Sequence, residues 1–241
     1  MANLIIDIGN TALKAAWSDG MTLGKTYRYQ GERVADFILD LVQKVKPEVM
    51  IISTVREISQ KYYDQFRKKC GRLVIMDSNH TEEIAAHGLP LFLTPDRAAS
   101  LIASRYLFKG KKCSVFDLGT ILTVDFMDQD GRYTGGNISV GCRTRFKSVN
   151  RYSKSLPLLD TPENISEKGT SLTSSIESGI ISGIVFEING YIERYPENIP
   201  VFTGGDAIYF AKRMKNSIFV VCNLVLMGLA LIADEYVKNI Q

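Results

Sequence analysis

Apolar positions along the chain alternate between the two-residue period of a strand and the 3.6-residue period of a helix, which predicts an α/β fold. In the first half, the predicted strands occupy residues 3–9, 12–18, 22–30, 49–55 and 72–78, and the predicted helices occupy residues 32–45, 57–69 and 95–107. The helix at 32–45 shows the period clearly, because Val34, Phe37, Ile38 and Leu41 share one face. Pro95 opens the last of these helices at a position where proline is preferred.

The same order of elements returns in the second half of the chain. The predicted strands occupy residues 113–120, 121–128, 132–139 and 200–205, the predicted helices occupy residues 142–154, 172–193 and 207–214, and a short strand and a final helix from about 224 follow. Each half opens with three strands, and the first strand of each ends in Asp-x-Gly, which indicates an internal duplication. We expect two domains, residues 1–111 and 112–241, each a mixed sheet flanked by helices, with the last helix able to pack back on the first domain.

Composition and charge exclude several classes of protein. The 241 residues are 45% hydrophobic and 23% charged, which is typical of a soluble globular protein. A net charge of +3 is too small and too scattered to favour nucleic acid as a partner. The apolar run at 218–233 is shorter than the roughly 20 residues of a membrane span and contains Asn223, so a buried strand and helix are expected there. With no signal peptide and no zinc spacing among its cysteines and histidines, the chain is expected to be cytoplasmic and free of the membrane.

The segment DIGNTALK, which begins at Asp7, is the first candidate site. An acid at the end of a buried strand requires a partner, and a metal ion or its water would serve. Gly9 is expected to turn with a positive φ and to let a phosphate approach the backbone. Asn10 and Thr11 offer hydrogen-bond donors, and Lys14 supplies a positive charge. The alternative is an ordinary hairpin in which Asp7 and Asn10 satisfy the turn.

A second segment, DLGT, repeats this arrangement and favours the phosphate interpretation. Asp117, Gly119 and Thr120 stand at the matching strand end of the second half. Two such turns facing each other can hold the β- and γ-phosphates of one nucleotide. A third motif contains Gly204 and Gly205, follows a strand and opens a helix, and it leaves room for an adenosine against bare backbone.

With these three motifs the chain resembles the superfamily of acetate and sugar kinases, Hsp70 and actin, and within it the type III pantothenate kinases, also called the Bvg accessory factor family. The resemblance extends over nearly the whole chain, through DIGNTALK, Asp96-Arg97, DLGTILTVD, GGNISVG, RFKSVNRYSKSLP and FTGGDA. It implies two RNase H-like (actin-like ATPase) domains with the nucleotide in the cleft between them. It also implies phosphorylation of the primary hydroxyl of pantothenate by ATP to give 4'-phosphopantothenate, the first step of coenzyme A biosynthesis. Mg²⁺ and a monovalent cation, K⁺ or NH₄⁺, are the implied cofactors, and a homodimer is the implied assembly.

The resemblance further implies roles for individual residues. The implied ATP-binding residues are Asp7, Ile8, Gly9, Asn10, Thr11, Ala12, Leu13, Lys14, Thr120, Gly204 and Gly205. Asp117 would bind the monovalent cation, Asp7 would hold Mg²⁺ through water, and Asp96 would be the catalytic base that accepts the hydroxyl proton. The implied substrate-binding residues are His87, Thr94, Pro95, Asp96, Arg97 and Leu172.

Several positions around the acceptor depart from the family pattern. Thr94 and Pro95 stand where the family usually has Gly-x, His87 stands where it has a tyrosine, and Leu172 replaces a threonine, with Thr173 next to it. A buried polar group of a ligand left without its partner costs about 1–3 kcal/mol. Two alternatives therefore stand beside pantothenate phosphorylation. One is a kinase of a related small hydroxy acid, and the other is a nucleotide-binding homologue with a weakened or altered acceptor site that serves a regulatory role.

Overall fold

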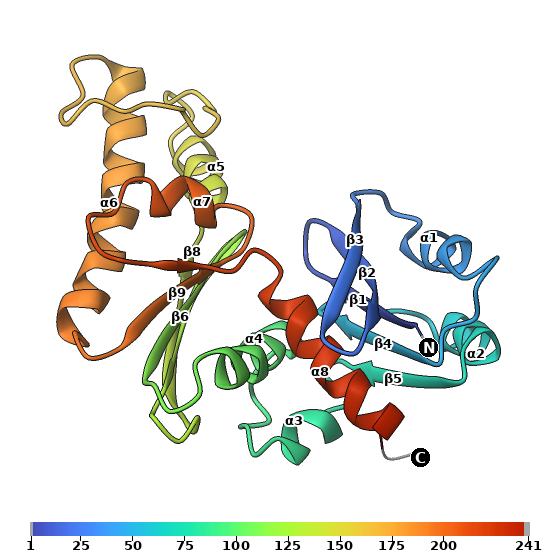
Figure 1. The fold of residues 1–241 in the computed structure, drawn as a ribbon. Coiled ribbons are helices and arrows are strands. Elements are labelled where there is room, and N and C mark those ends of the chain that lie inside the picture. The colour runs from blue at the N-terminus through green and yellow to red at the C-terminus, as the bar shows by residue number, and fades with distance from the viewer. Residues whose placement is uncertain (1, 239–241) are drawn as a thin grey trace. The chain divides into compact units, whose positions relative to one another are not determined.

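The computed structural model describes residues 2–238, which fold into two compact units (Figure 1). The chain passes from the first unit to the second between residues 109 and 110 and returns to the first between residues 222 and 223. The division expected from sequence lay between residues 111 and 112 and assigned the C-terminal segment to the second domain, with a return of the last helix left open. In the structure this helix belongs to the first unit.

The first unit is a five-stranded mixed sheet with helices on both faces. It contains the strands β1 (Asn3–Ile8), β2 (Leu13–Asp19), β3 (Thr22–Tyr29), β4 (Val49–Thr54) and β5 (Arg72–Met76) and the helices α1 (Val34–Leu41), α2 (Gln60–Lys69), α3 (Glu82–Ala86), α4 (Pro95–Leu107) and α8 (Leu224–Lys238). The strand order is β3-β2-β1-β4-β5. The central strand β1 is antiparallel to β2 and parallel to β4.

The second unit has the same sheet. It contains the strands β6 (Cys113–Leu118), β7 (Ile121–Met127), β8 (Tyr133–Val140), β9 (Ile199–Thr203) and β10 (Phe219–Val220) and the helices α5 (Cys142–Tyr152), α6 (Leu172–Arg194) and α7 (Ala207–Ala211). From its β8 edge the strand order is β8-β7-β6-β9-β10, which is the order of the first sheet. The central strand β6 is again antiparallel to one neighbour and parallel to the other, so the internal duplication is confirmed.

The central strands are buried on both faces, which explains their continuous apolar sequences. In β1, Leu4, Ile6 and Ile8 pack with α1 and α2, and Ile5 belongs to the opposite face. Helix α8 packs on the sheet of this unit and crosses α4 closely (Figure 1). At that crossing Gly228 lies against the backbone of Ala99 so tightly that a Cβ atom would clash. A glycine is therefore required in α8, although glycine weakens a helix by about 1 kcal/mol relative to alanine.

Periodicity located nearly all the elements, and the differences have simple physical causes. The five-residue helix α3 was not predicted, because it is shorter than two turns and presents no full apolar period. Helix α1 ends at Leu41 and not near residue 45, because residues 43–46 are exposed and add nothing to its packed face. The apolar run at 218–233 forms the short strand β10 and part of α8, as expected. Among residues 2–238, no helix combines the length and hydrophobicity needed to cross a membrane.

Candidate functional site

The turn between β1 and β2 is a compact loop of residues 9–12. The Gly9 N–H donates to the Ala12 carbonyl at 3.0 Å, and the tip residues Asn10 and Thr11 are exposed. Arg56 braces this loop from outside, because its Nη2 donates to the Asn10 carbonyl at 2.6 Å. The Arg56 N–H in turn donates to Thr54 Oγ1 at 3.0 Å. The loop is thus held in shape by a cation that also adds positive charge beside it.

The sequence analysis missed Arg56. It lies 46 positions from Asn10, and no spacing rule connects the two. The available signal was topological: β4 runs parallel to β1, so the residues that follow β4 lie at the same sheet edge as the end of β1. A basic residue directly after such a strand is a candidate for contact with the neighbouring turn.

A polar row crosses the first sheet where β1 ends. Asp7 of β1 is in register with Lys14 of β2 and with Ser53 of β4. Residues directly opposite one another point to the same face, and Ser53 Oγ donates to Asp7 Oδ1 at 3.2 Å. Asp7 is only partly buried, so this row places a carboxylate, a hydroxyl and an ammonium group together next to the loop.

The second sheet repeats this row with one chemical change. Asp117 of β6 is in register with Thr123 of β7 and with Thr203 of β9. Asp117 thus corresponds to Asp7 and Thr203 to Ser53, whereas Thr123 stands where the first sheet has Lys14. The cationic side chain is therefore present in only one of the two rows.

The turn of the second sheet, residues 119–121, is one residue shorter than the first. The Gly119 N–H donates to the Ile121 carbonyl at 3.2 Å. The Thr120 carbonyl accepts two hydrogen bonds, from the Gly141 N–H at 3.2 Å and from Thr144 Oγ1 at 2.7 Å. Thr120 therefore depends on residues at the start of α5 for its position.

The expectation that Gly9 turns with a positive φ is wrong. Gly9 is not among the glycines with a positive φ, and a Cβ atom there would meet only the Ala12 carbonyl, at an ordinary contact distance of 3.5 Å. Gly119 behaves in the same way, with its nearest neighbours at 3.6 and 3.7 Å. Neither backbone conformation nor packing within the chain requires glycine at these two positions.

The two glycines after β9 have different surroundings: the fold requires glycine at Gly204, whereas Gly205 has free space beside its backbone. Gly204 has a φ of +93° and lies against Leu118 and Asp117 of β6, so only glycine fits there. A Cβ atom built on Gly205 would meet, apart from the adjoining residues, no atom within 4 Å in the part of the chain that the structure describes. The pair thus combines a tight junction with β6 and a stretch of bare backbone beside it.

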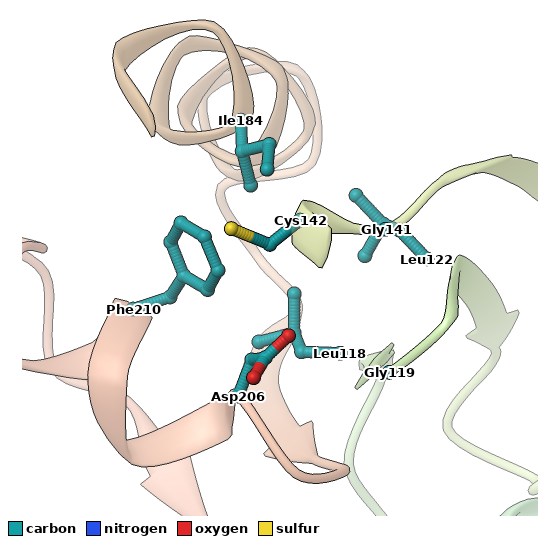
Figure 2. Close-up of a pocket in the computed structure, with 8 residues that line it drawn as sticks. All are labelled: Leu118, Gly119, Leu122, Gly141, Cys142, Ile184, Asp206 and Phe210. Atoms are coloured by element: carbon teal, nitrogen blue, oxygen red, sulfur yellow. The ribbon is translucent and has the colours of Figure 1, made fainter. Parts of the chain in front are cut away.

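A small recess lies next to this junction, within the second unit. Figure 2 shows the Cys142 thiol, the Phe210 ring and the Asp206 carboxylate on its wall, with Gly119 and Gly141 at one side. Burial raises the pKa of the Cys142 thiol, so the neutral thiol is a packing group here and not a nucleophile. Burial also raises the pKa of the Asp206 carboxyl above its ordinary value of 3.8.

The expected acceptor residues of the first unit lie at the start of α4. Thr94 is the exposed N-cap and Pro95 the first helical residue, as predicted. Asp96 lies in the first turn, where a helix favours negative charge, and its Oδ1 accepts the Arg97 N–H at 3.0 Å. Arg97 is only 6% exposed, so its charge lies deep in the protein.

The other two expected acceptor residues have different surroundings. His87 ends α3, where its Nδ1–H donates to the Glu83 carbonyl at 2.8 Å and its Nε2 lies 3.5 Å from Glu235 of α8. Leu172 opens α6 in the second unit and is 55% exposed, with Thr173 exposed beside it. His87 thus takes part in the contact between α3 and α8 in the first unit. Leu172 is exposed at the first residue of α6 in the second unit.

Comparison with known proteins places the chain in a family. A model of the type III pantothenate kinases matches residues 3–194. The chain belongs to the type III pantothenate kinase family. It is 33% identical over 230 residues to the type III pantothenate kinase of Azobacteroides pseudotrichonymphae, with 94% of each chain covered. It is 36% identical over 238 residues to the corresponding protein of Cytophaga hutchinsonii, with 94% of this chain and 96% of the relative covered.

Solved structures support the fold of this pantothenate kinase family member. A Baf-family protein of Campylobacter jejuni, described as a transcriptional activator, aligns with a TM-score of 0.64 at 18% identity over 99% of this chain and 100% of that one. The activator of 2-hydroxyisocaproyl-CoA dehydratase from Clostridium difficile, solved with ADPNP, aligns with a TM-score of 0.60 at 14% identity, over 100% of this chain and 97% of that one. At these identities the likeness concerns the fold alone, which is that of the actin-like ATPases and sugar kinases.

The half-buried Asp206 carboxyl makes the stability of this kinase depend on pH in a defined direction. Its folded pKa is raised, so the folded state holds a proton more tightly than the unfolded state and loses stability as pH rises from about 3.8 through the folded pKa. We expect Asp206→Asn to melt at a higher temperature than the wild type at pH 7, with a difference that shrinks toward pH 3.5. Thermal unfolding across this range, with the exposed Asp160→Asn as control, measures the effect. A difference that grows toward acid pH would contradict the assignment.

Proposed function

We propose that this chain is a pantothenate kinase that transfers the γ-phosphoryl group of ATP to the primary hydroxyl of pantothenate and forms 4'-phosphopantothenate, the first step of coenzyme A biosynthesis. One observation carries the proposal: the match to the family extends over residues 3–194 and so contains DIGNTALK, Asp96-Arg97 and DLGT together. The relatives are matched over nearly their full length. No comparison favours a regulatory homologue or a different hydroxy acid as acceptor.

We propose that residues 7–14 of the first unit bind ATP, and we propose the same role for Thr120, Gly204 and Gly205 of the second unit. Phosphoryl transfer requires mainly that the phosphates be positioned and their charge neutralised. The loop offers exposed polar residues at its tip, and Lys14 and Arg56 bring two positive charges to it. A Cβ atom on Gly9 or Gly119 would meet its nearest neighbours at ordinary contact distances and neither φ is positive, so glycine at both positions fits close approach of phosphate oxygens.

The donor groups fit the two cations that we propose as cofactors. Among residues 2–238 no three acidic, histidine or cysteine side chains gather into a metal cage. Mg²⁺ needs no such cage, because it is usually bound through one or two carboxylates plus the substrate phosphates. Asp7 would hold it through water, and the ion would neutralise the charge of the phosphates. Asp117, which is packed against Gly204, would bind K⁺ or NH₄⁺.

At the acceptor side we propose Asp96 as the base that orients the hydroxyl and accepts its proton, with Arg97 and Thr94 binding substrate beside it. Pro95 holds this turn of α4 in helical geometry from its first residue. In the second unit we propose Leu172, which is 55% exposed, as a further contact for substrate. His87, with a side chain only 12% exposed, would support the pocket from its wall.

We further propose a homodimer formed through α6. One face of this helix is exposed and carries Gly179, Phe186 and Gly190, and Phe186 is 72% exposed. Among residues 2–238, apart from the adjoining backbone of α6 itself, no atom lies within 4 Å of a Cβ atom built on Gly179 or Gly190. Each glycine weakens the helix by about 1 kcal/mol relative to alanine, and a second α6 approaching closely would explain why they are kept. The cytoplasm is the expected location, and it agrees with the four free cysteines.

The activity is tested by ADP release with and without pantothenate, in K⁺ and in Na⁺. We expect release that depends on pantothenate and is faster in K⁺. Asp96→Asn should lower kcat by about a hundredfold or more, since general-base catalysis contributes about 10²–10⁴. If ATP binds but ADP release is the same with and without pantothenate, the result would favour the regulatory alternative. Normal turnover of Asp96→Asn would exclude Asp96 as the base.

Gly9→Ala separates ligand binding from folding. The chain has room for the added methyl group, so the free energy of unfolding should change by no more than about 0.5 kcal/mol. The methyl group would nevertheless occupy space proposed for phosphate, and the Kd for ATP should rise by about tenfold or more. Calorimetric titration with ATP and urea unfolding measure the two effects. Unchanged ATP affinity would remove Gly9 from the site.

The dimer is tested by Phe186→Glu, which places a charge on the exposed face of α6. We expect the variant to sediment as a monomer in analytical ultracentrifugation, because a charge at a packed interface is poorly solvated. Val45→Glu, which changes a similarly exposed apolar residue of the first unit, should leave the mass unchanged. A wild-type chain that sediments as a monomer at micromolar concentration would refute the proposal directly.

A further inference from the structure

Arg145, on the first turns of α5, joins three separate segments of the second unit. Its Nε–H donates to the Val140 carbonyl at 2.8 Å, and its Nη2 donates to Ser139 Oγ at 3.2 Å. The same Nη2 forms an ion pair with Glu187 of α6. Both charged side chains are more than three-quarters buried, at 23% and 22% exposure. A solvated surface arginine would not be enclosed in this way, so the guanidinium has a fixed place in the fold.

The backbone that Arg145 holds leads directly to the second turn. Val140 ends β8, and the next residue, Gly141, donates its N–H to the Thr120 carbonyl. Gly141 also packs on the backbone of Gly119 so closely that a Cβ atom would clash. Thr144, one residue before Arg145, donates to the same Thr120 carbonyl at 2.7 Å. A shift of the β8–α5 junction would therefore move both donors of Thr120 together.

We propose that Arg145 is a positioning residue for the phosphoryl-transfer reaction, and that Glu187 fixes it. The pair holds the junction between β8 and α5, and the junction sets the place of Thr120. The inference rests on the proposed function, in which Thr120 contacts ATP. It assigns Arg145 no contact with substrate of its own.

An arginine thus holds each of the two turns in place, although the two arginines do so through different contacts. In the first unit Arg56 donates directly to the carbonyl of Asn10 in the turn. In the second unit Arg145 acts one step away, through Gly141 and Thr144. The planar fork of an arginine bonds a carbonyl through Nε and a carboxylate through Nη2, two separate nitrogens held in fixed geometry, whereas a lysine has all its donors on one nitrogen. The inference therefore predicts that lysine is a poor substitute for Arg145.

The test compares Arg145→Gln, Arg145→Lys and Glu187→Gln with Arg151→Gln. Arg151 lies on the same helix, is exposed and gives the same change in charge. We expect Arg145→Gln to raise the KM for ATP about tenfold, a free-energy change of about 1.4 kcal/mol, with the KM for pantothenate unchanged. Arg145→Lys should not restore it, Glu187→Gln should shift the KM for ATP in the same direction, and Arg151→Gln should resemble the wild type.

The outcomes separate this inference from the proposed function. If the variants melt at lower temperature but keep the wild-type KM for ATP, Arg145 has only a structural role and the inference is overturned. Should Arg145→Gln fail to fold, the milder Glu187→Gln decides by the same criterion. A wild-type chain without pantothenate-dependent ADP release would overturn the proposed function, and calorimetric titration of ADP would then decide the inference. A tenfold weaker affinity in Arg145→Gln would support it, and equal affinity would overturn it.

Discussion

In each sheet of this protein the next-to-last residue of the central strand is a half-buried carboxylate, Asp7 or Asp117, and the polar geometry beside it follows from that constraint. A carboxylate at this position is tolerated only where neighbouring groups compensate for lost hydration. In the first unit Ser53 donates to Asp7 and Lys14 lies opposite it. In the second, Thr123 and Thr203 flank Asp117 in the register. The strands that bring these partners are the immediate neighbours of the central strand, so the sheet order itself provides the compensation.

Duplication and divergence are both visible in these two rows. The strand order and the place of the acid are common to the two units. The positively charged side chain is present in the first unit only, because Thr123 stands in the second row at the place of Lys14. The second turn is also one residue shorter than the first. A row that includes a lysine suits polyphosphate, whereas an acid among neutral oxygens suits a weakly bound cation. Divergence of the two copies thus separates the proposed tasks of holding phosphate and of holding a monovalent ion.

Membership of the pantothenate kinase family changes how the altered acceptor residues are interpreted. From sequence, a histidine at position 87 and a leucine at 172 removed polar contacts that the family pattern provides. In the structure the His87 side chain hydrogen-bonds to the Glu83 carbonyl and lies beside Glu235, so it belongs to the contact between α3 and α8 in the first unit. Relatives of this chain at about one-third identity carry the same family name over nearly their whole length. The change at position 87 is therefore compatible with the proposed reaction.

The sequence by itself determined the elements, the duplicated order and the two Asp-x-Gly turns, because these depend on local periodicity and on the burial of short apolar runs. Tertiary structure alone decided the partners across the sheet. Arg56 beside Asn10 and Arg145 behind Thr120 come together through strand order and helix packing, which no spacing in the chain records. It also corrected the reason for Gly9, whose φ is ordinary. A glycine in the sequence permits an unusual backbone conformation. Only the atoms around it show whether the fold uses that conformation or whether the missing side chain leaves space beside the backbone.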